Sequence, residues 1–125
     1  MAMPPETPPP PLSAELVRAL TGEKPNPPSD DETRALLRLI EIAVGPTGQS
    51  RRVADFLLAW WNARQCGSFD LTTLWGVDDV IAEDMVTVFG LIARVHQYPD
   101  TLGYDKQFKT IVRAWRPELS DGKPD

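Results

Sequence analysis

The chain has 125 residues and a formal net charge of −5, with 42% hydrophobic and 25% charged residues. These values are typical of one soluble domain with a real core, and no apolar run approaches the roughly 18–20 residues that a transmembrane helix needs. An acidic chain is not a nucleic-acid binder by bulk attraction. The single cysteine excludes an internal disulfide, and the N-terminus lacks a signal-peptide pattern. We therefore expect a cytoplasmic protein.

Residues 1–28 are rich in proline and are predicted to be a disordered tail containing one short helix. The run MAMPPETPPPPL is either a ligand for a groove-binding domain or a solvated tail, and both interpretations stay open. Ser13 can cap the short helix AELVRAL. Its small apolar edge is formed by Leu16, Val17 and Leu20. This edge either docks on the body of the protein or is available to bind a partner.

The segment 30–44 is the first long predicted helix. Ser29 and Glu32 have the spacing of a capping box, and Gly45-Pro46 ends the helix. The residues predicted to form its buried stripe are Leu36, Leu37, Ile40 and Val44.

The segment 51–66, with Ser50 as a plausible cap, has an apolar arc wider than half the circumference of a helix. Only Asp55 and Asn62 mark a clearly polar side. Such a helix needs several neighbours, so we predict that it is the central helix of a small bundle. The main apolar residues of its arc are Val53, Phe56, Leu57, Trp60 and Trp61.

A short helical plug and the longest helix are predicted next. Asp70 can cap the plug, and Asp78 can cap a helix over 79–97 that would pair antiparallel with 51–66. The plug residues predicted to point inward are Leu71, Leu74 and Trp75. The apolar arc predicted for the long helix contains Val80, Ile81, Met85, Val88, Phe89, Leu91, Ile92 and Val95.

The last predicted helix covers 105–115 and ends before Pro117, with a loose tail over 120–125. Its regular buried stripe consists of Phe108, Ile111, Val112 and Trp115. No alternating strand pattern is convincing. The prediction is an all-α domain over 29–119, a small bundle of four main helices plus the plug.

Residues that could support catalysis or metal binding have simpler explanations. His96 is the only histidine, and we expect it on the apolar arc of its helix, either packed and bonded to a carbonyl or charged at the helix C-terminus. Cys66 is expected to be a small packed hydrophobe. The acids at 78, 79, 83 and 84 are better explained by capping than by a metal site. We therefore expect no enzyme, no cofactor, no metal and no small-molecule substrate.

Two sets of residues are candidates for binding. Four tryptophans exceed what a core of this size requires, and exposed aromatics are favoured anchors at protein interfaces. The candidate partner-binding residues are Trp60, Trp61, Trp75 and Trp115. A basic stripe on the last helix could instead bind the phosphate backbone of a nucleic acid, or form an ordinary solvated face. The alternative nucleic-acid-binding residues are Lys106, Lys109, Arg113 and Arg116.

A family resemblance is carried by three stretches of the chain, FLLAWWNA, FDLTTLWGVDDVIAEDM and YPDTLGYDKQFKTIVRAWRPEL. Over about 33–119 the chain resembles a family of small uncharacterised bacterial proteins carried on plasmids and integrative elements. The resemblance implies a bacterial cytoplasmic setting, with a host factor or nucleic acid as partner, and it assigns no functional residue. The first hypothesis is a non-enzymatic protein-binding accessory or regulatory protein, with inhibition of a host factor and self-association as variants. The alternative is a nucleic-acid-binding protein.

Overall fold

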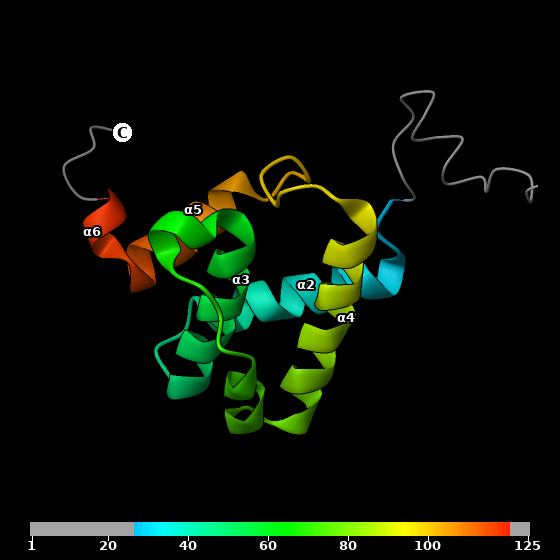
Figure 1. Ribbon diagram of the computed structural model, residues 1–125, viewed down its shortest axis with the longest axis horizontal. Coiled ribbons are helices and arrows are strands. Elements are labelled where there is room, and N and C mark those ends of the chain that lie inside the picture. Colours follow the sequence, from blue (N-terminus) through cyan, green and yellow to red (C-terminus); the bar gives the residue numbers. More distant parts are fainter. Residues whose placement is uncertain (1–26, 121–125) are drawn as a thin grey trace, which may run out of the picture.

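The computed structural model describes residues 27–120, and within them the chain forms helices and no strand (Figure 1). The elements in order are α2 (Asp30–Ala43), α3 (Gly48–Cys66), the 3₁₀ turn η1 (Leu71–Gly76), α4 (Asp79–Val95), α5 (Asp105–Trp115) and α6 (Pro117–Ser120). The predicted all-α class, with four main helices and a short plug, is confirmed. The predictions for 1–26 and 121–125 lie outside the described residues.

Helix α2 begins with the predicted capping box. Ser29 Oγ accepts a hydrogen bond from the Glu32 amide at 3.1 Å, and Glu32 Oε1 accepts one from the Ser29 amide at 2.9 Å. The stripe on this helix is broader and rotated from the predicted one, so Leu37 and Val44, both predicted to be buried, are exposed. Its buried residues are Ala35, Leu36, Leu39, Ile40 and Ala43.

The position of α2 explains that broad stripe. Helix α2 packs against α3, α4 and α5, whereas α3 and α4 contact each other only slightly (Figure 1). The prediction that 51–66 forms a hairpin with 79–97 is therefore wrong, whereas the prediction that 51–66 has several neighbours is confirmed. The apolar arc of α3 is wide because α2, α5 and η1 all pack against it, while α4 lies chiefly on α2.

Helix α3 begins earlier than predicted and is interrupted near its end. Thr47, rather than Ser50, is the N-cap, and its Oγ1 accepts a hydrogen bond from the Ser50 amide at 3.0 Å. Asn62 departs from helical geometry with φ −164° and ψ 79°. The Asn62 side-chain oxygen accepts from the Gln65 amide at 3.3 Å, so this residue caps a separate last turn.

The plug η1 has the predicted Asp70 cap, with Asp70 Oδ1 accepting from the Thr72 amide at 2.9 Å. Leu74 packs against the core as predicted, but Leu71 and Trp75 are exposed. Because a 3₁₀ helix has three residues per turn, Trp75 points about 120° away from Leu74.

Helix α4 has a narrower buried side than predicted, because α2 covers one side of it. Val80 and Phe89 were predicted to be buried and are exposed. The helix ends at Val95, and His96 adopts a left-handed conformation with φ 58° and ψ 40°. This turn takes the His96 side chain off the apolar arc, so the imidazole is exposed rather than packed, although the expected contact with a carbonyl is present at Ala93.

Helix α5 agrees with its prediction over 105–115. Phe108, Ile111 and Val112 are buried, and Trp115 packs against the core while half-exposed. Arg116 ends the helix and Pro117 begins the short α6. Within residues 27–120, none of the helices is long and apolar enough to cross a membrane.

Candidate partner-binding surfaces

Two of the four candidate tryptophans hold the fold together. Trp60 Nε1 donates to the Gln97 carbonyl at 3.1 Å, and its ring meets Phe108 edge-on with centroids 5.9 Å apart. Trp115 Nε1 donates to the Ala43 carbonyl at 2.6 Å, which ties α5 to the end of α2. A half-buried indole that satisfies its N–H in this way is explained by packing alone.

Trp75 differs from these two because its side chain lies outside the core. It is 85% exposed, and Leu71, in the same turn, is 66% exposed. Val80, in the first turn of α4, is 68% exposed. Three large apolar side chains thus reach solvent within ten consecutive residues, and we name Leu71, Trp75 and Val80 the Trp75 surface.

The turn that carries Trp75 is fixed at both ends. Gln49, in the first turn of α3, accepts a 2.6 Å hydrogen bond from the Asp78 amide through Oε1 and donates to Asp78 Oδ2 at 3.2 Å. At the other end, the Thr72 hydroxyl donates to Asp70 at 2.7 Å and lowers the pKa of that carboxyl. The exposed indole is therefore presented on an ordered support.

The Arg52 side chain of α3 packs closely on Gly76 at the end of η1. A Cβ on Gly76 would lie 2.8 Å from Arg52 Nε, so the Arg52 side chain passes directly against the backbone of the turn. Leu74 and Val77 pack inward on either side of this contact. Gln49 and Arg52 thus position the Trp75 surface. Neither role could be predicted from the sequence, because a polar residue early in a helix has many explanations.

The interruption of α3 at Asn62 borders an open recess of about 540 Å³. Trp60 and Trp61 both line it, so the structure brings these two candidate tryptophans to one place. Tyr98, which is 61% exposed, and Asp100 approach from the segment after α4. Sequence reasoning missed Tyr98, although an aromatic residue directly before a proline in a connecting segment is a usable signal.

The basic stripe of α5 is divided between surface and interior. Lys106, Lys109 and Arg113 are exposed, and Lys109 Nζ lies 3.2 Å from Asp105 Oδ2. Arg116 is partly buried, and its guanidinium donates to the Cys66 carbonyl at 3.0 Å and to Asp55 Oδ1 at 2.8 Å. Three residues of the predicted nucleic-acid stripe thus face solvent, and the fourth links α5 to α3.

Several other titratable groups are held by contacts within the fold. Burial raises the pKa of the Cys66 thiol, whose side chain lies in the core. His96 Nε2 lies 2.9 Å from the Ala93 carbonyl. Asp84 receives two hydrogen bonds from Arg38, at 2.8 and 2.9 Å, which raise the pKa of that guanidinium. Among residues 27–120, no three His, Cys, Asp or Glu side chains form a group that could hold a metal ion.

The fold and these surfaces define a small all-α protein with an exposed tryptophan on an ordered turn and a half-buried aromatic recess. The chain belongs to a family of unknown function, DUF7673, which matches residues 33–116. No curated protein and no solved structure matches the chain.

Proposed function

We propose that the chain is a non-enzymatic protein-binding accessory or regulatory protein whose partner contacts the Trp75 surface. The observation that carries this proposal is the 85% exposure of Trp75 on a turn fixed by Gln49 and Asp78. Tryptophan is among the residues that contribute most to binding energy at protein interfaces. An exposed indole on an ordered support loses little conformational freedom on binding, which favours affinity.

The exposed apolar neighbours support a protein partner over a nucleic acid. Leu71 and Val80, within five residues of Trp75 in the chain, offer further exposed aliphatic area, whereas phosphate recognition depends on cations. The nearby acids Asp78 and Asp79 disfavour a phosphate backbone at this place. Burial of the three side chains would supply the apolar centre of an interface.

The setting of this activity is also a proposal. The resemblance of the chain to small proteins of plasmids and integrative elements suggests an accessory of a bacterial mobile element acting in the cytoplasm. A host factor is then the natural partner class, and inhibition of that factor is one form the regulation would take.

The test begins with affinity capture from a bacterial lysate on immobilised full-length chain. A protein recovered in stoichiometric amount is purified and titrated against the wild type, Trp75→Ala and Leu37→Ala. Leu37 is the matched control, since it is another exposed large apolar residue but lies on α2. We expect Trp75→Ala to weaken the Kd about tenfold or more, as expected for an anchor residue, and Leu37→Ala to leave it unchanged.

Solution mass, measured by sedimentation for the wild type and Trp75→Ala, separates a heteromeric partner from self-association. A wild-type dimer that Trp75→Ala converts to a monomer would identify the partner as a second copy. Equal binding and equal mass for the two proteins would refute the role of Trp75.

A further inference from the structure

The side of α4 that faces away from α2 carries exposed apolar residues, with the acids Asp79 and Glu83 near its N-terminal end. Val86 is 61% exposed and Phe89 is 57% exposed, one helical turn apart. Ala82, Gly90 and Ala93 lie on the same side by helical spacing, and a shallow depression of about 580 Å³ runs beside Ala82 and Val86. We name these five residues, Ala82, Val86, Phe89, Gly90 and Ala93, the outer face of α4.

Within residues 27–120, the neighbours of α4 lie on its opposite side. The buried residues of α4 include Met85, Val88 and Leu91, and the helix packs chiefly on α2. The described part of the chain therefore leaves Val86 and Phe89 in solvent. Exposed apolar side chains grouped in this way mark a surface that something covers.

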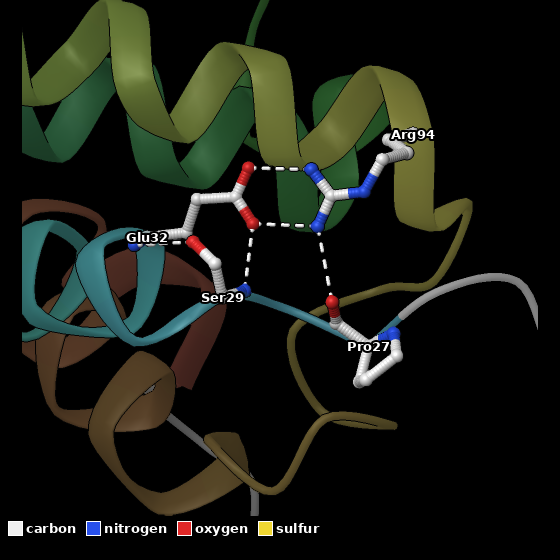
Figure 2. Close-up of polar contacts among 4 residues, drawn as sticks. All are labelled: Pro27, Ser29, Glu32 and Arg94. Carbon is white, nitrogen blue, oxygen red and sulfur yellow. Dashed lines mark hydrogen bonds and ion pairs between the residues drawn. The ribbon is translucent and has the colours of Figure 1, made fainter.

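The chain enters the described region beside this face. The Pro27 carbonyl accepts a hydrogen bond from Arg94 Nη2 at 3.0 Å. Nη1 and Nη2 of Arg94 both donate hydrogen bonds to the Glu32 carboxylate (Figure 2). Arg94 follows Gly90 by one turn on α4, at the edge of the outer face. The residues before Pro27 therefore start from the C-terminal end of that face.

The preceding sequence contains an apolar edge of matching size. The spacing of Leu16, Val17 and Leu20 would place them on one side of a helix formed by AELVRAL. Six residues lie between Leu20 and Pro27, and the seven Cα–Cα steps from one to the other can span up to about 23 Å. Phe89 and Val86 lie five and eight residues before Arg94, which is about 8 and 12 Å along a helix. The linker is long enough to reach both.

We infer that the segment 13–21 of the chain docks as a helix on the outer face of α4 and covers Val86 and Phe89 with Leu16, Val17 and Leu20. The bond from Arg94 to Pro27 fixes the start of the linker, so the effective concentration of the segment at this face is in the mM range. A second copy of the chain would have to compete against that concentration. The inference is independent of the proposed role of Trp75.

The first experiment places a nitroxide on full-length protein at Thr21→Cys, beside the apolar edge, in a Cys66→Ala background. We expect selective paramagnetic broadening of the backbone amides of Val86 and Phe89, with Thr110 on α5 unaffected. Adding Phe89→Asp should abolish the broadening. In a mixture of labelled chains with unlabelled ¹⁵N chains, the same amides should stay sharp.

Broadening in that mixture would identify a second copy as the occupant and overturn the inference. Absence of selective broadening in the labelled chain itself would also overturn it, provided that circular dichroism shows a folded protein.

The second experiment needs no cysteine change. Trypsin cleavage after Arg18 is followed by mass spectrometry for the wild type, Phe89→Asp and the matched variant Leu37→Asp. Docking protects the bond after Arg18, so we expect Phe89→Asp to accelerate cleavage of this bond about tenfold, equivalent to about 1.4 kcal/mol of docking free energy. We expect Leu37→Asp to leave the cleavage rate unchanged. Equal rates in all three proteins would overturn the inference.

Discussion

Glu32 and Arg94 form a two-point ion pair between the first turn of α2 and the last turn of α4, with both N···O distances at 2.6 Å (Figure 2). The Glu32 side chain is only 12% exposed. The hydrogen bonds from Arg94, supported by the Ser29 amide, lower the pKa of the Glu32 carboxyl from 4.5 to about 2. This pair joins two helices that are distant in sequence, so protonation of Glu32 affects the stability of the whole bundle.

Acid should destabilise the protein through Glu32. The carboxyl has a lower pKa in the folded chain than in the unfolded one, so its stabilising contribution is complete above pH 4.5 and is lost as the pH falls toward 2. The wild type should lose about 3 kcal/mol over that window. Urea titrations at several pH values should show that Glu32→Gln lacks this component, while Glu41→Gln, an exposed carboxyl on the same helix, retains it. An identical pH profile for Glu32→Gln and the wild type would contradict the prediction.

Trp115 and Trp60 should contribute to stability through their indole N–H groups. Phenylalanine at either position removes a donor and leaves the Ala43 or Gln97 carbonyl without that bond. We expect each change to lower the free energy of unfolding by about 1–2 kcal/mol. Trp75→Phe is the matched control, and its effect should stay within about 0.5 kcal/mol because the side chain is exposed. A larger loss for Trp75→Phe than for Trp115→Phe would contradict these assignments.

The left-handed conformation of His96 predicts an order of stability between two variants. Both His96→Gly and His96→Ala remove the imidazole and its contact with the Ala93 carbonyl. Only glycine tolerates φ 58° without steric cost. Chemical denaturation should therefore show His96→Gly more stable than His96→Ala by about 1 kcal/mol. Equal stabilities would mean that the helix end relaxes to another conformation.

Cys66 should be unreactive in the folded protein. Its thiol is buried and its pKa is raised by that burial, so both access and thiolate population are low. Iodoacetamide should alkylate the native chain at least about tenfold more slowly than the chain in urea at the same pH. Similar rates in the two states would show that the α3 end opens readily.

The helices were predictable because their ends depend on local chemistry. Ser29 with Glu32, Asp70 and Pro117 each act on neighbouring backbone groups, and the regular stripe of α5 leaves one possible inner side. The orientation of the other elements depends on which helices meet. Phe89 and Val80 belong to an apolar arc wide enough for two neighbours, and periodicity alone does not tell which side is covered.

The candidate site was predictable only in part for the same reason. Tryptophan content drew attention to Trp75, but the sequence pattern assigned it to the core, because a short turn gives no reliable period. The supports of this turn come from Gln49 and Arg52 on α3. Such contacts across the fold leave no mark in the local sequence.

The packing of three later helices against α2 also bears on how the chain folds during synthesis. Helix α2 leaves the ribosome before α3, α4 and α5, yet all three later helices cover its buried side. A nascent chain that has reached only Cys66 can pair α2 with α3 but leaves the α4-facing residues of α2 uncovered. The bundle is therefore completed only after α5 emerges, and we expect it to unfold as one cooperative unit rather than as two halves.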